Sequence, residues 1–325
     1  MWSPNMVKVF LTFDCEDFIN QRSVYALNRL LELLQRYNLK AIFFLTGHMC
    51  EKLRSFPRIL TLLEEHEIGY HSTSHSVHPN IFEYTDVENY KAAYHISLKR
   101  EQSRINPLTG EIEGRGGFLL LKDLFPNKKI VAFRAPGFCW SPPHLEALEK
   151  LGIRFDFSTC LSRTPIRYKK ITFYPFPIGG YRFMSMRPWV SLLISHNAVL
   201  MSHPRNLVKH YNDADWDSIY CTGNPKRLYT VQNCWEERQG ALESFELFLK
   251  TTSFLAKKGM LQITPPLQEG IDKTRFTKED VLRSYRRSIN WAESLFNCTP
   301  KFLLRHFFKY FNIEPELAKD EPRLY

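Results

Sequence analysis

Seven short apolar runs, rich in β-branched and aromatic residues, recur along this chain, with helical patterns between several of them. The runs lie at residues 7–13, 40–46, 67–70, 129–133, 153–157, 198–202 and 260–264. Their length and composition are typical of buried strands. Helical patterns cover 23–37, 57–66 and 141–152, the last with prolines in its first turn and Gly152 at its end. This alternation predicts an α/β fold with a parallel sheet, and about seven strands predict a closed or nearly closed barrel.

Two segments interrupt the alternation, and the last part of the chain is helical in places. The glycine-rich stretch 106–117, "NPLTGEIEGRGG", has turn chemistry and predicts a loop insertion, either a lid or a mobile surface loop. A second insertion is predicted at about 206–238. We therefore expect a barrel over residues 1–269 with these two insertions, and a C-terminal helical extension over 270–325.

Composition limits the classes of partner and compartment. With 44% hydrophobic residues the chain can bury a large core, and its net charge of +10 favours an anionic partner. No nucleic-acid-binding motif or long basic stripe is present, so we expect no nucleic-acid partner. Seven scattered cysteines without a CxxC pair argue against a disulfide framework, and the first residues lack a basic signal-peptide region. These features predict a cytoplasmic protein.

Acid/base and metal-ligand residue types follow five of the predicted strands. They are Asp14, Glu16, His71, His75, Arg134, Asp156 and His203. Because the active site of a parallel barrel forms at the carboxyl ends of its strands, we expect these side chains to converge.

The spacing of His71 and His75 is compatible with metal binding. If the chain is helical there, residues four apart project from one face, and two histidines with a carboxylate and an open position make a catalytic zinc-type site. A polar loop rich in His and Ser explains the histidine pair alone equally well.

Five motifs together carry a family resemblance. "TFDCED", "HSTSH", "FRAPGF", "FDFS" and "LMSHP" resemble, in order and rough spacing, the motifs of the polysaccharide deacetylases, also called NodB-homology or carbohydrate esterase family 4 enzymes. The resemblance spans roughly residues 5–266. It implies a distorted (β/α)7-type barrel and metal-dependent removal of an N- or O-acyl group from a sugar.

The resemblance also implies roles for residues around the metal. Asp14 resembles the general base, and Arg134 the arginine that keeps this base ionised and oriented. His71 and His75 resemble the two imidazole ligands. Phe138 stands where the family usually has a tyrosine whose backbone N–H binds the oxyanion, and a phenylalanine keeps that main-chain donor.

Two further residues are matched in the later motifs. His203 resembles the general acid that protonates the leaving amine. Asp156 resembles the aspartate that supports this histidine and raises its pKa.

The first motif departs from the commonest family pattern, in which the second of two adjacent aspartates binds the metal. Here Cys15 occupies that place, whereas a cytoplasmic branch of the family has Asp-x-Asp or Asp-x-Glu. Residues two apart in a strand point the same way, so we predict Glu16 as the carboxylate ligand and keep Cys15 as a minority candidate. Asp17 is expected to cap the following loop or helix.

These observations give a functional expectation. A divalent metal, with zinc as our first choice, would serve removal of an acyl group, acetyl in our expectation, from an amino sugar on a phosphate-bearing lipid- or nucleotide-linked intermediate. A deformylase or amidohydrolase, or a non-catalytic glycan- or lipid-binding protein with a disabled metal site, remains the alternative. The segment 301–311, "KFLLRHFFKYF", suits either peripheral contact with the inner membrane face or packing on the barrel, which explains it more simply.

Overall fold

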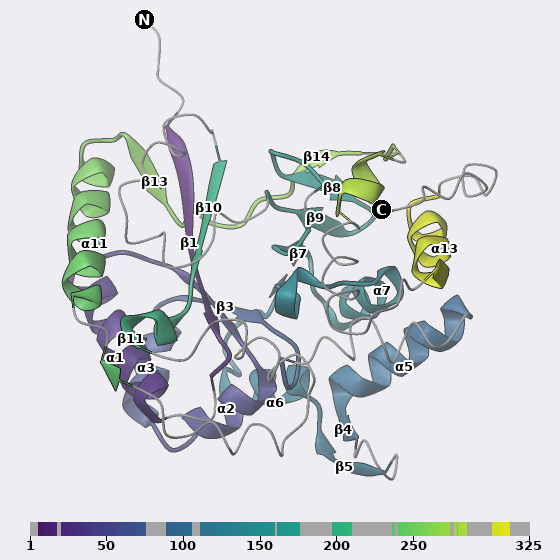
Figure 1. The fold of residues 1–325 in the computed structure, drawn as a ribbon, viewed down its shortest axis with the longest axis horizontal. Helices are drawn as coiled ribbons and strands as arrows, with labels where there is room; N and C mark the ends of the chain where they lie inside the picture. The colour runs from purple at the N-terminus through teal and green to yellow at the C-terminus, as the bar shows by residue number, and fades with distance from the viewer. Residues whose placement is uncertain are drawn as a thin grey trace, which may run out of the picture.

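The fold is taken from a computed structural model of the chain. It describes residues 6–17, 21–75, 89–105, 111–159, 161–175, 197–209, 236–237, 240–273, 276–277, 279–284 and 301–312. Figure 1 shows a curled sheet with helices packed around it.

The main sheet has ten strands and is parallel except for one pair. In the order β10-β1-β2-β3-β6-β7-β9-β8-β14, with β13 also beside β1, they are β10 (Asn197–Ser202), β1 (Val7–Cys15), β2 (Ile42–Leu45), β3 (Glu67–Tyr70), β6 (Ala132–Phe133), β7 (Phe155–Asp156), β9 (Ile171–Phe173), β8 (Ile166–Tyr168), β14 (Ile271–Asp272) and β13 (Leu261–Ile263). Only β8 and β9 pair antiparallel among the described strands of this sheet. The predicted α/β class is confirmed. Over the described residues the sheet is a curled half-barrel that ends at β10 and β14, not a closed ring.

Helices cover the outside of this sheet. They are α1 (Gln21–Arg36), α2 (Gly47–Leu53), α3 (Pro57–Glu64), α5 (Tyr90–Gln102), α6 (Gly117–Leu124), α7 (Pro142–Leu151), α11 (Ala241–Lys257) and α13 (Lys301–Tyr310), with short 3₁₀ turns η2 (Pro136–Phe138) and η4 (Pro204–Leu207). The three helices expected from the sequence are α1, α3 and α7. As predicted, α7 has prolines at its first positions and is followed by Gly152, which has a left-handed φ of 110°.

The predicted insertions are described in part. Strands β4 (Ser103–Ile105) and β5 (Ile112–Arg115) pair antiparallel on either side of residues 106–110, which lie outside the described residues. Gly117 already begins α6. Of the second insertion, β11 (Val208–Lys209) and β12 (Glu236–Glu237) form a short antiparallel pair, and residues 210–235 are not described.

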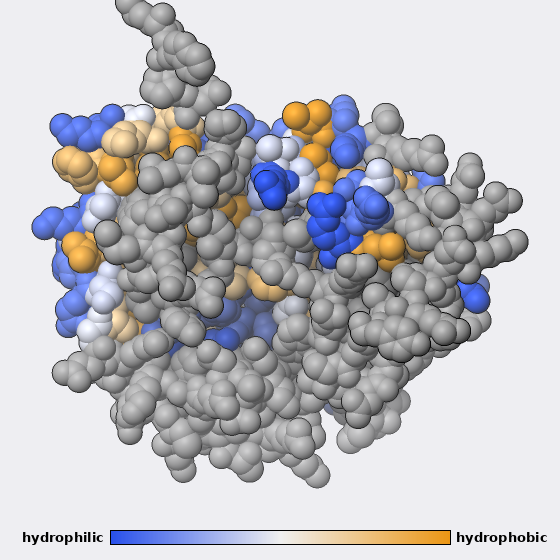
Figure 2. Space-filling view, turned by 45° about the horizontal axis from the view of Figure 1, so that its top comes forward, coloured by the Kyte–Doolittle hydropathy of each residue, from blue (hydrophilic) through white to orange (hydrophobic). Residues whose placement is uncertain are grey.

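The described parts of the C-terminal segment pack onto the sheet and α7. Strand β14 pairs with β8, and the Phe307 ring of α13 lies 4.6 Å from the Trp140 ring. Phe307, Phe308 and Phe311 are buried in the protein, so this aromatic face of α13 is not available to a membrane surface. No helix in the described part of the chain is long and apolar enough to cross a bilayer. In the view of Figure 2, exposed apolar side chains of the described residues lie in several separate groups among hydrophilic ones.

Candidate metal centre and active site

Strand β1 sends alternate side chains to two different environments. Asp14 and Glu16 are buried at its carboxyl end and face polar partners, whereas Cys15 lies in the hydrophobic core. Burial, followed by the nearby charges of Asp14 and Glu16, raises the pKa of the Cys15 thiol well above its usual value. Cys15 is absent from both donor groups found among the described residues, and Glu16 belongs to each of them.

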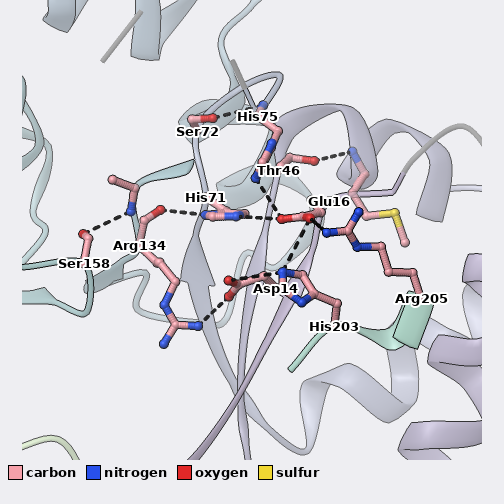
Figure 3. Close-up of polar contacts among 12 residues, drawn as sticks. Asp14, Glu16, Thr46, His71, Ser72, His75, Arg134, Ser158, His203 and Arg205 are labelled. Carbon is pink, nitrogen blue, oxygen red and sulfur yellow. Dashed lines mark hydrogen bonds and ion pairs between the residues drawn. The ribbon is translucent and has the colours of Figure 1, made fainter. Parts of the chain in front are cut away.

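Glu16 meets both predicted histidine ligands. Its Oε2 atom lies 3.2 Å from His71 Nε2 and 2.8 Å from His75 Nε2, as Figure 3 shows. His71 Nδ1 lies 2.7 Å from the main-chain oxygen of Arg134, which can only accept a hydrogen bond. Nδ1 therefore carries the proton, and Nε2 is left as the nitrogen that faces Glu16.

The two histidines are brought together by a bent loop and not by a helix, which corrects one part of the sequence interpretation. Residues 71–75 follow β3 without helical hydrogen bonding, and Ser72 and His75 have left-handed φ angles of 64° and 60°. The Ser72 hydroxyl accepts a hydrogen bond from the His75 N–H at 3.1 Å. The imidazole rings nevertheless lie 4.9 Å apart, so the loop achieves the juxtaposition that a helical turn would give.

Asp14 is held by a different partner. Arg134, fully buried, donates from Nη1 to Asp14 Oδ1 at 2.6 Å and from Nη2 to the Thr12 hydroxyl at 2.9 Å. Its guanidinium also lies 4.4 Å from the centre of the Phe44 ring. Burial lowers the pKa of Arg134, against the opposing effect of Asp14. The arginine fixes the orientation of the Asp14 carboxylate.

His203 and Arg205 close the site from the end of β10. His203 Nε2 lies 3.5 Å from Glu16 Oε1 and 3.9 Å from Asp14 Oδ2. Arg205, in η4, places Nη2 at 2.9 Å from the same Glu16 oxygen. Arg205 was not predicted from the sequence. The available signal was its place two residues after His203, because a cation beside buried carboxylates compensates their charge.

Burial and charge set opposite pKa directions within the cluster. Burial alone raises the pKa of Glu16, but His75, His203 and Arg205 outweigh it, and the pKa lies well below the ordinary value. Burial lowers the pKa of His71, but Asp14 and Glu16 outweigh it and raise the pKa. For His203, burial prevails and lowers the pKa to about 4. The site therefore combines ionised Glu16 with a His203 that is neutral near pH 7.

Two predicted residues have partners other than those expected. The Asp156 carboxylate accepts hydrogen bonds from the Ser158 hydroxyl at 2.6 Å and from the N–H groups of Ser158 and Thr159, each at 3.0 Å. These bonds make it the acceptor of a tight turn after β7, and its support of His203 stays a prediction. The Phe138 N–H donates to Ala135 O at 2.9 Å within η2, so this predicted oxyanion donor is engaged in a turn.

The donor set fits a divalent metal. Nitrogen and oxygen donors of Glu16, His71 and His75 lie within 4.8 Å of one another, and Asp14, Glu16 and His203 form a second such group. One carboxylate with two imidazoles is a ligand set of catalytic zinc sites, and neutral imidazoles also suit other divalent transition metals.

Sequence comparison connects this geometry to a family. Residues 4–115 match the family described as polysaccharide deacetylase, and this segment contains Asp14, Glu16, His71 and His75. The predicted resemblance to this family is confirmed over these residues, and the assignment to its cytoplasmic branch stays a prediction. The polysaccharide deacetylase match supports a hydrolase that deacetylates a glycan. A search of curated proteins found no match.

Several solved structures also match the chain. A CE4 esterase from Streptococcus mutans matches at 16% identity and a TM-score of 0.41, over 83% of this chain and 87% of that one. A family 4 carbohydrate esterase from Bacillus anthracis matches at 15% identity and a TM-score of 0.37, over 80% of this chain and 82% of that one. A CE4 family pseudoenzyme, also from Bacillus anthracis, matches at 13% identity and a TM-score of 0.40, over 80% of this chain and 64% of that one.

Proposed function

We propose that this protein is a metal-dependent hydrolase that removes an N-acyl group, acetyl in the first instance, from an amino sugar. The observation that carries the proposal is that two neighbouring carboxylates have different partners. Asp14 is held by Arg134 at 2.6 Å, whereas Glu16 faces two imidazoles at 2.8 and 3.2 Å. A base and a metal ligand need these different surroundings within one site.

Glu16, His71 and His75 would hold the metal, with zinc as our first choice. When bound, such a metal polarises the acyl carbonyl and lowers the pKa of water, which makes hydrolysis feasible near neutral pH. The Nδ1 hydrogen bond of His71 to Arg134 O, at 2.7 Å, fixes the tautomer in which Nε2 of the neutral imidazole is the nitrogen that faces the site.

The remaining residues move protons. Asp14 would take a proton from the attacking water at its Oδ2 atom, because Arg134 occupies Oδ1. His203 Nε2, at 3.9 Å from Asp14 Oδ2, would pass a proton to the leaving nitrogen. Since its pKa is lowered to about 4, His203 is neutral near pH 7 in the metal-free site, and the proton it passes on would be the one that Asp14 takes from the attacking water.

The substrate we propose bears phosphate, as a lipid- or nucleotide-linked sugar intermediate, and the protein works in the cytoplasm or at the inner membrane face. The net charge of +10 supports an anionic substrate. The buried aromatic face of α13 argues against anchoring of the protein at a membrane by that helix.

Metal analysis combined with an acyl-release assay tests the proposal. Protein purified without added metal is reconstituted with zinc, and acetate and formate are measured from N-acylated amino sugars with and without phosphate. About one equivalent of zinc and chelator-sensitive acetate release is expected. Formate as the main product would favour the deformylase alternative. No zinc after reconstitution, together with no acyl release from any substrate, would favour the binding protein with a disabled metal site.

His203→Ala distinguishes two roles for that residue, proton donor and metal ligand. As a proton donor, its loss should reduce turnover by about 10²- to 10⁴-fold while zinc content stays near one equivalent. Loss of zinc together with turnover would show instead that the group Asp14, Glu16 and His203 is the metal site.

A further inference from the structure

A second cluster of buried polar side chains lies next to the histidine loop. Tyr70 ends β3, Glu101 lies near the end of α5, and His144 is in the first turn of α7. The Tyr70 hydroxyl donates to Glu101 Oε2, and His144 Nε2 lies 2.6 Å from Glu101 Oε1. Their exposed fractions are 0%, 2% and 0%, so the three groups share one carboxylate away from water.

Aromatic rings surround this cluster. The Tyr70 ring lies 5.5 Å from the Phe118 ring, and the Phe133 ring lies 6.0 Å from Tyr70 and 5.5 Å from His144. In such surroundings a polar network is stable only when its members satisfy one another, and removal of one member leaves the others costly to bury. The position of each group is therefore strongly coupled to the other two.

The cluster is connected directly to the loop that carries His71 and His75. Tyr70 precedes His71, and its hydroxyl lies 3.3 Å from the Thr73 hydroxyl in the middle of the loop. Thr73 in turn accepts a hydrogen bond from the Gly117 N–H at 3.0 Å, through its side chain. A carboxylate on α5 thus reaches the metal-ligand loop through a single tyrosine hydroxyl.

The loop has a reason to need such support. Left-handed backbone at Ser72 and His75 costs free energy and persists only where surrounding contacts determine it. The packing against it is close, because a Cβ atom at Gly117 would lie 2.6 Å from Thr73 Cα and 2.9 Å from the Tyr70 hydroxyl. Contacts that fix the position of Thr73 therefore also fix the directions in which the imidazoles of His71 and His75 point.

We propose that Tyr70, Glu101 and His144 are positioning residues that set the geometry of the loop 71–75 and thereby the affinity of the Glu16, His71 and His75 site for a divalent cation. The inference rests on the proposed function in that it takes a metal to be the ligand of that site. The positioning itself belongs to the metal-free protein and can be measured there.

Tyr70→Phe is the test variant and Tyr90→Phe is its matched control. Tyr90 begins α5, and its hydroxyl donates to Glu146 on α7 at 2.7 Å, so both variants remove one tyrosine hydroxyl from a glutamate. Hydrogen–deuterium exchange of the backbone at 71–75 is measured without metal, and zinc affinity is measured by competition with a chelating dye. We expect faster exchange and a zinc affinity about 10- to 100-fold weaker in Tyr70→Phe only. Glu101→Gln should resemble Tyr70→Phe.

The outcomes separate this inference from the proposed function. Equal exchange at 71–75 in wild type, Tyr70→Phe and Tyr90→Phe overturns the positioning role, whatever the enzyme assay shows. If wild type binds zinc but releases no acyl group, the proposed reaction fails while the affinity comparison still decides the inference. If wild type binds no zinc, the link to metal affinity is overturned and the proposed function with it.

A second variant, in the loop 71–75 itself, keeps the inference testable if Tyr70→Phe does not fold. This second test variant is Thr73→Val. Thr73 is partly exposed, and its hydroxyl contacts both the Tyr70 hydroxyl and the Gly117 N–H, so this substitution removes both contacts. Its faster exchange and weaker zinc binding would support the inference, and wild-type values of both would overturn it.

Discussion

Asp14, in β1, and Glu16, directly after it, are two residues apart and point the same way, yet their partners give them different roles. We predict that Asp14→Asn reduces turnover by about 10²- to 10⁴-fold with zinc content unchanged, because it removes a base and no ligand. Glu16→Gln should instead weaken zinc binding, since an amide is a poorer ligand than a carboxylate. Metal content after dialysis and steady-state rates test both, and equal zinc content in wild type and Glu16→Gln would refute the ligand assignment.

Arg205 compensates the charge of Glu16 when no metal is bound. Replacement by Met leaves Glu16 Oε1 without its 2.9 Å ion pair. We expect the metal-free protein to lose about 1.5–3 kcal/mol of unfolding free energy, the range for a hydrogen bond to a charged group. Zinc should recover part of this loss, because a bound cation replaces the missing charge. Urea unfolding with and without zinc measures it, and an equal loss in both states would contradict the compensation.

At the scale of elements, the sequence predicted where strands end better than how loops turn. The strand predicted at 67–70 matches β3 in both bounds, since its composition marks a buried strand. The bend at 71–75 was not predictable, because its left-handed residues are Ser72 and His75 and not glycine. The hairpin of β8 and β9 was missed for the same reason, since its turn has Lys169 at a φ of 54°. Partners such as Arg205 depend on tertiary packing, which spacing does not encode.

The end of α7 gives a test of backbone conformation alone. A Cβ atom at Gly152 would meet nothing within 4 Å, but its φ is 110°. Gly152→Ala should therefore lower the unfolding free energy by about 1 kcal/mol through strain. Gly114 is equally open and lacks that conformation. Gly114→Ala should leave stability unchanged or slightly higher in the same urea titration, and equal effects of the two substitutions would exclude a conformational cause.

At the scale of the molecule, the last described helix belongs to the core. Phe307 is fully buried with its ring 4.6 Å from Trp140. Phe307→Ala should cost about 3–5 kcal/mol of unfolding free energy through lost contacts and the cavity left behind. Leu247→Ala, at a site 64% exposed on α11, should cost little. A small cost at Phe307, in thermal or urea unfolding, would mean that α13 is only loosely attached.

The pairing of β1 with both β2 and β10 has a consequence for biosynthesis. One edge of β1 can pair with β2 soon after β2 is synthesised. The partner of the other edge, β10, begins only at Asn197. At about 5–20 residues per second, the ribosome leaves that edge unpaired for roughly 10 to 40 seconds. An unpaired apolar edge attracts other strands. The nascent chain is therefore most exposed to misassembly, and most in need of chaperones, between synthesis of β2 and arrival of β10.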